Sequence, residues 1–372
     1  MDVPLLIFSN TKKDSDLFYL IGTHVPDNIA VVFDGQESIA LVSALEINRL
    51  RNTSKIDKFV SWDVVKSSLQ SAQNTDFDIL RRFLQDLRLK TICVKQDFPI
   101  YLADQLRSAN FEIIVAGFSI LPQRLIKSDG EITEIKHAID IVRQTFVQVE
   151  NILSNASING KNELVFEDEI LTSERLRTMM ETFCYRLGAI ADDTIVACGI
   201  DACDPHNLGY GPLKANEFIL IDFFPHLKTS GYYADVSRTF IKGKPTKEQN
   251  DLYITVKAAH DIAVDMAYGG VQAKDIMMRT LEYFESKEYK SSNTTNPPYG
   301  MFHSLGHGLG LDIHEPPRIG ICDGILQPGM VVTIEPGLYY QTIGGVRIED
   351  DILIGNQSSE ILTQIPHNWI IE

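Results

Sequence analysis

Three strand-like segments of this chain carry carboxylates at positions where the surrounding residues predict burial. Asp222 interrupts EFILIDFFPH, Glu335 interrupts GMVVTIEPGLYY, and GGVRIEDDILIG carries Glu349 followed by two aspartates. β-Branched and aromatic residues of high strand propensity flank each acid. A buried carboxylate is costly unless it is protonated or faces a cation. Any fold of this chain must therefore bring protons or counter-charges to these strands.

A fourth acid and a histidine-rich segment strengthen this constraint. Asp235 lies 13 residues after Asp222, and a hairpin turning at HLKTSG would place the two acids on adjacent antiparallel strands. The segment HSLGHGLGLDIHEPP holds three of the nine histidines, and its glycines let the backbone pass close to a metal pocket. Each acid alone could be a strand-end carboxylate paired with arginine or a backbone N–H. Four carboxylates and an imidazole together form a set of mostly oxygen ligands. Such a set suits Mn²⁺, Co²⁺, Fe²⁺ or Zn²⁺ rather than a thiolate-bound zinc.

The overall composition excludes several classes of function. The net charge of −16 argues against binding of nucleic acid and of anionic membranes, because both require clustered lysine and arginine. No apolar run approaches the length of a membrane span. The five cysteines are odd in number and show no C-x-x-C pair, so we expect reduced thiols in a cytoplasmic protein.

The length of 372 residues predicts two domains. Short strands alternate with helical patterns over the first third, and IAVVFD and SIALVSA read as a hairpin. We expect Ser128, Asp129 and Gly130 to break the chain. Apolar residues at spacings of three and four then predict a long amphipathic helix from Ile132 to Val149. Strand-like segments dominate after residue 300. The prediction is a mixed α/β domain over residues 1–122 and a second domain over residues 123–372.

The order of the candidate ligands resembles a known family. The series is Asp222, Asp235, His307, Glu335 and Glu349, in the settings IDFF…GYYADVSRTF, HSLGHGLGLDIHEPP, TIEPG and GVRIEDD. It resembles the metallopeptidases of the pita-bread fold, which include methionine aminopeptidase, aminopeptidase P and prolidase. The resemblance runs from about residue 120 to the C-terminus. The first domain and the linker RLIKSDGEI resemble those of the Xaa-Pro enzymes and of creatinase. This implies a creatinase-like N-terminal domain before a pita-bread catalytic domain.

The resemblance implies a role for each residue of the series. Two divalent metal ions are expected, with manganese preferred and cobalt or zinc as alternatives. Asp222 would chelate one ion, Asp235 and Glu349 would bridge both, and His307 and Glu335 would complete the second site. A hydroxide bridging the metals would attack the scissile carbonyl. Glu335 would also take up and return the proton.

Four further residues receive roles from the same resemblance. His314 would donate a hydrogen bond to the developing oxyanion. His206 and His303 would contact the substrate. Arg347, two residues before Glu349 and on the same strand face, would bind substrate or pair with a site acid. We expect Pro316 and Pro317 to end the preceding strand.

Two local features depart from a simple match or leave a choice open. The interval from Asp222 to Asp235 is two residues longer than is common in the family, which a longer hairpin turn would accommodate. In the EDD run, strand alternation places Glu349 and Asp351 on one face and Asp350 on the other. Only the match to the family motif selects Glu349 as the metal ligand.

The expected function is hydrolysis of Xaa-Pro bonds at a free N-terminus by a cytoplasmic homodimer. A prolidase would take dipeptides and an aminopeptidase P longer peptides, and the motifs do not separate the two. Methionine aminopeptidase is disfavoured by the N-terminal domain. A creatinase-like reaction without metal is disfavoured by the complete ligand set, as is a non-catalytic binding module.

Overall fold

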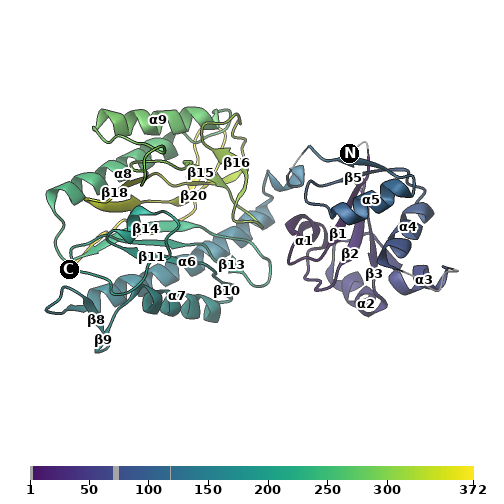
Figure 1. Ribbon diagram of the computed structural model, residues 1–372, viewed down its shortest axis with the longest axis horizontal. Coiled ribbons are helices and arrows are strands. Elements are labelled where there is room, and N and C mark those ends of the chain that lie inside the picture. The colour runs from purple at the N-terminus through teal and green to yellow at the C-terminus, as the bar shows by residue number, and fades with distance from the viewer. Residues whose placement is uncertain (1–2, 70–74, 118) are drawn as a thin grey trace. The chain divides into compact units, whose positions relative to one another are not determined.

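The computed structural model describes residues 3–69, 75–117 and 119–372. The chain divides into two compact units, Met1–Pro122 and Gln123–Glu372 (Figure 1). Within the described residues, no helix combines the length and the apolar character needed to cross a bilayer.

A mixed sheet forms the centre of the first unit. Six strands in its described part lie in the order β4-β3-β2-β1-β5-β6. β1, β2 and β3 are antiparallel, whereas β4, β5 and β6 each join a parallel neighbour. The predicted hairpin is therefore the β2–β3 pair. The strands are β1 (Leu5–Ser9), β2 (Ile29–Phe33), β3 (Ser38–Val42), β4 (Lys58–Ser61), β5 (Thr91–Val94) and β6 (Glu112–Val115).

Helices cover both faces of this sheet, as the strand pattern requires. Alternate residues of a strand point to opposite faces. Leu5 and Ile7 pack with α1 and α2, whereas Leu6 packs with α3, α4 and α5. The first unit is thus a three-layer α/β/α structure with a core on each side of the sheet. The helices are α1 (Ser15–Ile21), α2 (Ala44–Thr53), α3 (Trp62–Ser67), α4 (Asp76–Asp86) and α5 (Ile100–Ser108).

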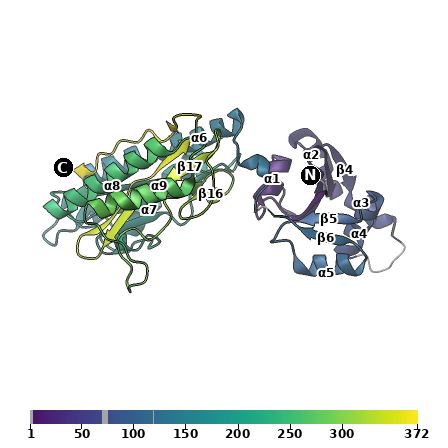
Figure 2. The same ribbon diagram turned by 90° about the horizontal axis from the view of Figure 1, so that it is seen from above.

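The second unit, all of which is described, encloses its strands between two pairs of helices. Figure 1 shows α8 and α9 along one side of the strands and α6 and α7 along the other. Figure 2 shows α8 and α9 lying side by side. The helices are α6 (Asp129–Asn155), α7 (Ser173–Leu187), α8 (Lys247–Met266) and α9 (Ala273–Ser286). The described chain also has two 3-10 turns, Pro122–Arg124, where the first unit ends and the second begins, and Asp201–Cys203 in the second unit.

The strands of the second unit form two larger sheets, a small three-stranded sheet (β7-β8-β9) and two pairs (β10-β13 and β18-β19). One large sheet has the order β11-β12-β14-β22 and the other β16-β15-β17-β20-β21. The strands of the larger sheets are β11 (Ile195–Cys198), β12 (Ile219–Phe223), β14 (Val236–Lys242), β15 (Gly306–Gly308), β16 (Glu315–Ile319), β17 (Val331–Ile334), β20 (Asp350–Leu353), β21 (Glu360–Ile361) and β22 (Ile370–Ile371). The short strands are β7 (Ser157–Ile158), β8 (Leu164–Phe166), β9 (Glu169–Ile170), β10 (Ala189–Ile190), β13 (His226–Leu227), β18 (Gly337–Tyr340) and β19 (Gly344–Arg347).

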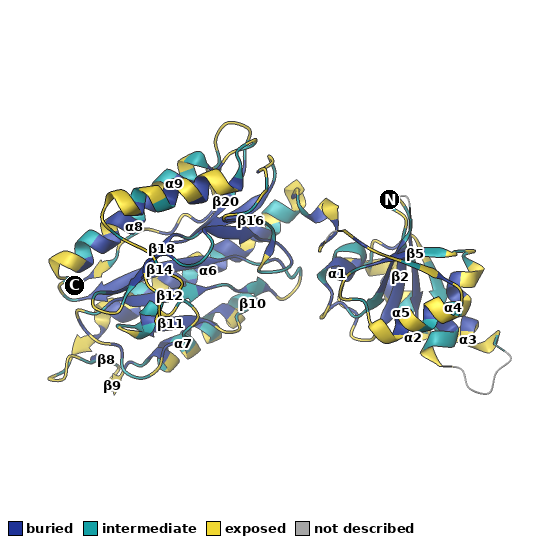
Figure 3. Cartoon of the chain, turned by 45° about the horizontal axis from the view of Figure 1, so that its top comes forward, coloured by how far each residue is buried: buried dark blue, intermediate teal, exposed yellow. Residues whose placement is uncertain are grey.

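Burial in the second unit concentrates where helices meet strands. Leu252 and Val256 of α8 and Ile276 of α9 pack with Val332 and Ile334 of β17 in one core. Figure 3 shows buried strands between helices whose outward faces are exposed. The carboxylates of the sequence series therefore enter a region walled by apolar side chains.

The start of α6 corrects one sequence-based expectation. Ser128 to Gly130 do not break the chain but begin the helix. The Ser128 hydroxyl accepts the N–H of Glu131, and the Glu131 carboxylate accepts the N–H of Ser128 at 2.9 Å. This capping box satisfies N–H groups that a helix N-terminus leaves open. The amphipathic helix is confirmed, because Ile135, Ile139 and the later apolar positions are buried.

The position of the double proline corrects a second sequence-based expectation. Pro316 and Pro317 do not end a strand but lie within β16. β16 is an edge strand that pairs on one side only, with β15, and the register shifts between His307 and Gly308. Prolines cannot donate to a sheet ladder, so an edge strand with an irregular register is where they are tolerated.

Candidate metal centre

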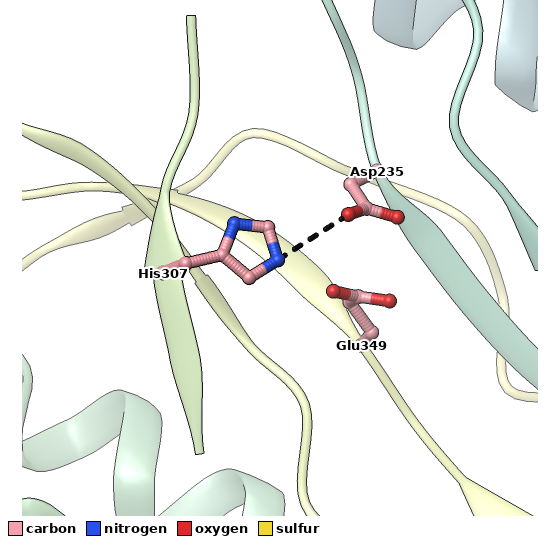
Figure 4. Close-up of side chains that lie close together, drawn as sticks. All are labelled: Asp235, His307 and Glu349. Carbon is pink, nitrogen blue, oxygen red and sulfur yellow. Dashed lines mark ion pairs between the residues drawn. The ribbon is translucent and has the colours of Figure 1, made fainter. Parts of the chain in front are cut away.

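Three side chains from distant parts of the sequence converge inside the second unit. Asp235 precedes β14, His307 lies on β15, and Glu349 lies between β19 and β20 (Figure 4). Each offers one ligand atom, and these atoms lie within 4.8 Å of one another. All three residues are buried, and the Nε2 of His307 is 3.6 Å from Oδ2 of Asp235. The three ligand atoms are therefore close enough together to bind one metal ion.

The other two acids of the series border the same cavity. Glu335 follows β17, and its Oε1 is 3.6 Å from Nε2 of His307. Asp222 lies on β12 opposite Ser237 of β14, so the predicted hairpin forms and carries Asp222 and Asp235 to the site. The cavity has a volume of about 1070 Å³. Every sequence-predicted site residue lines it: Asp222, Asp235, His307, Glu335, Glu349, His206, His303, His314 and Arg347.

The hydrogen bonds of His307 fix which ring nitrogen is available. Its Nδ1 is 3.1 Å from the carbonyl oxygen of Gly308, which can only accept, so Nδ1 carries the proton. Burial is the main cause that lowers the pKa of His307 to about 4, so the ring is neutral at neutral pH. The lone pair of Nε2 then points at the carboxylates of Asp235 and Glu335. A neutral imidazole held this way is a metal ligand.

Burial and mutual repulsion disfavour the charged forms of the carboxylates in this cluster. Burial and, secondarily, the nearby carboxylates raise the pKa values of Asp235 and Glu349 well above their usual range. Burial also raises the pKa of Glu335 to about 8. The Oδ1 atoms of Asp222 and Asp235 are buried and accept no hydrogen bond from any described residue. Orphaned buried oxygens beside a neutral imidazole are the donor set that divalent cations prefer. The residues present therefore fit a divalent metal.

Arg347 anchors the side of the site that holds Asp222. Its Nη2 donates to Oδ2 of Asp222 at 2.7 Å, Nη1 to the hydroxyl of Tyr339 at 3.0 Å, and Nε to Oγ of Ser237 at 2.8 Å. The predicted ion pair with a site acid thus exists. Ser237 in turn donates to Oε2 of Glu349 at 2.9 Å. The substrate contact assigned to Arg347 stays a prediction.

The three acids of the EDD run face three different environments. Glu349 enters the cavity. Asp350 pairs with Arg238 at 2.6 Å, and Arg238 also donates to the carbonyl of Glu349 at 2.6 Å. Asp351 accepts the N–H of Asp235 at 3.1 Å. Only Glu349 therefore joins the group of potential ligands, while its neighbours fix the backbone around it.

The remaining histidines line the cavity but differ in exposure and in the hydrogen bonds of their rings. His314 is exposed to the cavity, and its ring centroid lies 4.4 Å from that of His307. His206 is also exposed, in the turn after Asp201–Cys203. His303 differs, because its Nδ1 faces the carbonyl of Ser304 at 2.7 Å and its Nε2 faces the hydroxyl of Tyr339 at 3.0 Å. Both of its nitrogens are thus engaged within the protein, and the ring forms part of the wall.

Sequence reasoning missed Tyr339, which contacts two residues of the wall from behind, and several residues of the wall itself. Tyr339 joins His303 to Arg347, and the motif TIEPGLYY that carries Glu335 also carries this tyrosine. Arg318 and Phe224 are among the missed residues that line the cavity. Arg318 lies four residues after His314, so strand alternation could have placed both on one face. Phe224 lies two residues after Asp222, so strand alternation could likewise have placed these two residues on one face.

Comparison with known proteins identifies the class of this site. Residues 133–356, more than half of the chain, match metallopeptidase family M24. The chain belongs to metallopeptidase family M24. The matched span includes all five potential ligands of this metallopeptidase, from Asp222 to Glu349. It is an enzyme family, so the expectation of a metallopeptidase is confirmed.

Individual relatives extend the likeness of this M24 metallopeptidase over nearly its whole length. It is 28% identical over 367 residues to the Xaa-Pro dipeptidase of Pyrococcus furiosus, covering 95% of this chain and 92% of the relative. It is 31% identical over 264 residues to an uncharacterized peptidase of Bacillus subtilis, covering 70% and 68%. The prolidase structure from Pyrococcus horikoshii superposes with a TM-score of 0.79 at 25% identity, covering 99% and 95%.

The fold of an X-Pro aminopeptidase from Thermotoga maritima is similar too. Its TM-score is 0.81 at 23% identity, covering 99% of this chain and 97% of that one. The predicted fold of this M24 metallopeptidase, an α/β domain followed by a pita-bread domain, is thereby confirmed.

Proposed function

We propose that this M24 metallopeptidase hydrolyses Xaa-Pro dipeptides at their single peptide bond. The observation that carries the proposal is the convergence of Asp222, Asp235, His307, Glu335 and Glu349 on one cavity. The similarity to proteins named Xaa-Pro dipeptidase and prolidase supports the choice of substrate.

The five converging residues would hold two divalent metal ions. Asp222, Asp235, Glu335 and Glu349 would supply carboxylates, and His307 would supply a neutral imidazole. Divalent cations held there would polarise the scissile carbonyl and would lower the pKa of a water molecule. We propose manganese as the resident ion, because the ligand set is mostly hard oxygen, with cobalt and zinc as alternatives.

Glu335 is placed to move the proton of the reaction. Its Oε1 faces Nε2 of His307 at 3.6 Å, whereas its Oε2 lies 3.9 Å from Nδ1 of His303. One oxygen can hold an ion while the other accepts the proton of the attacking water. Glu335 then delivers that proton to the proline nitrogen as the carbon–nitrogen bond breaks.

His314 and His206 are placed to contact the polar atoms of the substrate. Both are exposed on the cavity wall, and neither belongs to the group of potential ligands. His314 donates a hydrogen bond to the oxygen that becomes negatively charged as water adds to the carbonyl. His206 and the ring of His303 form part of the wall around the space in which the substrate lies.

Arg318 supports a dipeptide rather than a longer peptide. Its guanidinium is the exposed cation of the cavity wall, and no described carboxylate lies within ion-pair distance of it. In an Xaa-Pro dipeptide the α-carboxylate of the proline is free. Arginine recognises a carboxylate through two parallel hydrogen bonds. A longer peptide presents an uncharged amide at that position.

Two further proposals concern the state of the enzyme. We propose a cytoplasmic location, which the five free cysteines support because thiols stay reduced in that compartment. We also propose a homodimer, measurable by light scattering of the metal-loaded enzyme.

Hydrolysis assays with matched substrates test the proposed function. Metal-free protein would be reloaded with Mn²⁺, Co²⁺ or Zn²⁺ and given Gly-Pro, Gly-Pro-Ala and a longer Xaa-Pro peptide. We expect cleavage of Gly-Pro alone, and Arg318→Met should raise KM for Gly-Pro. Cleavage of the longer peptides would instead make the enzyme an aminopeptidase P. If metal binds and none of the peptides is cleaved, the Xaa-Pro specificity is wrong. If no metal binds either, the domain is a binding module.

A further inference from the structure

A buried ion cluster lies beside the metal centre but outside it. Glu315, the first residue of β16, pairs with Arg124 and with Nζ of Lys127, the latter at 2.8 Å. The three side chains are at most 2% exposed. Arg124 and Lys127 precede α6, about 190 positions before Glu315 in the sequence, and all three belong to the second unit. This is the part of the linker RLIKSDGEI that the proposed chemistry leaves unexplained.

The Glu315 carboxylate also folds the loop that precedes it. Oε1 accepts the N–H of Leu311 at 2.8 Å and of Asp312 at 3.1 Å. Arg124 reaches the same loop directly, through an ion pair with Asp312 at 2.8 Å. A Cβ on Gly310 would lie 2.7 Å from the carboxylate, so only glycine lets the loop close this tightly. The segment from Gly310 to Glu315 is therefore wrapped around one buried carboxylate.

His314, at the end of this loop, has an exposed side chain. It directly precedes Glu315, at the end of the bend over residues 311–314 that leads into β16. The carboxylate of Glu315 is held by the two buried cations, whereas the side chain of His314 is exposed on the wall of the cavity, which both residues line. Its ring stands edge-on to His307, with 86° between the ring planes. The position of His314 is thus set by where Glu315 is held.

We propose that Arg124 and Lys127 are positioning residues for His314, acting through Glu315 and the loop it folds. This inference rests on the proposed function, in which His314 donates to the oxyanion. Burying an ion cluster adds little net stability, because desolvation offsets the attraction between the charges. What the cluster supplies is a fixed direction for a histidine on a glycine-rich loop. A donor aimed at a developing charge loses most of its effect when it is displaced by about 1 Å.

A double-mutant cycle between Lys127 and His314 tests the proposal. Lys127→Met removes one cation and leaves Glu315 paired with Arg124, so the chain should still fold. In the manganese-loaded enzyme with Gly-Pro, we expect Lys127→Met to lower kcat about tenfold with KM unchanged, and His314→Ala about a hundredfold. In the His314→Ala background, Lys127→Met should cost less than about twofold. Equal losses of kcat in both backgrounds would show that Lys127 does not act through His314.

Hydrogen exchange gives a readout that does not depend on activity. The amides of Leu311 and Asp312 donate to Glu315, so Lys127→Met should speed deuterium uptake of the peptide that contains them. Lys136→Met is the matched control, because Lys136 pairs with Glu360 at the same 2.8 Å but on the surface. Metal affinity, measured by calorimetry with Mn²⁺, should not change in either variant. Uptake that is identical in wild type and Lys127→Met would overturn the proposal.

Two outcomes separate this inference from the proposed function. If the wild-type enzyme cleaves no Xaa-Pro peptide, the proposed function fails, while hydrogen exchange still decides whether the cluster restrains the loop. If Lys127→Met does not fold, Glu315→Gln replaces it in the cycle and in the exchange measurement. The glutamine keeps the shape and the oxygen that accepts the loop amides but loses the charge that Arg124 and Lys127 hold.

Discussion

The guanidinium of Arg347 and the carboxylate of Asp222 form an ion pair of 2.7 Å at the edge of the metal centre. Arg347 is 3% exposed and reaches Asp222, Tyr339 and Ser237 with different nitrogens. It therefore fixes one oxygen of Asp222 and leaves the other, Oδ1, without a hydrogen-bond donor among the described residues. A carboxylate oriented in this way meets a metal ion with little loss of side-chain freedom.

Arg347→Lys should weaken metal binding although it keeps the positive charge. A lysine has one ammonium group and cannot hold Asp222, Tyr339 and Ser237 at fixed angles. Loss of a group that orients a ligand costs about 10- to 100-fold in metal affinity. Calorimetric titration with Mn²⁺ measures the change, and circular dichroism checks the fold. Wild-type affinity in this variant would show that the ion pair does not orient Asp222.

The metal-free protein should lose stability as the pH rises. The pKa of Glu335 is 4.5 when the group is free and about 8 in the folded protein, because burial disfavours its charge. Glu335 therefore keeps its proton in the folded state up to about pH 8, whereas in the unfolded state it loses the proton near pH 4.5. Below pH 6.5 His307 acts in the opposite direction, because only the unfolded state protonates it there, so the free energy of unfolding falls between about pH 6.5 and pH 8.

Urea unfolding of the metal-free protein at a series of pH values measures this loss. Glu335→Gln carries no titrating carboxylate at the position and should show a flatter profile than the wild type. A profile as steep in Glu335→Gln as in the wild type would place the pH dependence in other groups.

Adding a divalent metal should raise the melting temperature of the second unit. A ligand that binds only the folded state at about 100 times its dissociation constant stabilises that state by about 2.7 kcal/mol. For a unit of this size the corresponding shift is about 5 °C or more. Calorimetry with and without Mn²⁺ measures it. In Asp235→Asn the shift should shrink, while the metal-free variant should melt higher than the metal-free wild type, because asparagine removes the cost of burying a carboxylate whose charged form burial disfavours. A metal-free Asp235→Asn that melts lower than the metal-free wild type would contradict this account.

More of the candidate site could be predicted from the sequence than of the paths of the segments around it. The five potential ligands and the Arg347 ion pair follow from acids at strand positions and from the order of the motifs. The path of Pro316 and Pro317 could not be predicted, because it depends on β16 being an edge strand, which is a property of the whole sheet. Likewise Glu315 is an ordinary acid in the sequence. Its role depends on two cations about 190 positions away, and no local pattern reveals such a contact.

Phe224 is the residue through which the longer hairpin between Asp222 and Asp235 should affect specificity. It follows β12 and lines the cavity together with Ile195, Phe302 and Ile313. We expect this apolar wall to contact the side chain of the N-terminal residue of the substrate. Phe224→Gly should lower kcat/KM for Leu-Pro about tenfold, because an aromatic wall contributes on the order of 1–2 kcal/mol to binding an apolar group, and should change Gly-Pro little.

The ratio of kcat/KM for Leu-Pro to that for Gly-Pro isolates this effect, since changes in metal content cancel in the ratio. Ile321→Gly serves as the control, because Ile321 is an exposed apolar residue that does not line the cavity. A ratio that is equal in wild type and Phe224→Gly would show that the N-terminal side chain of the substrate does not reach this wall. A rise in the ratio would show that Phe224 instead obstructs large side chains.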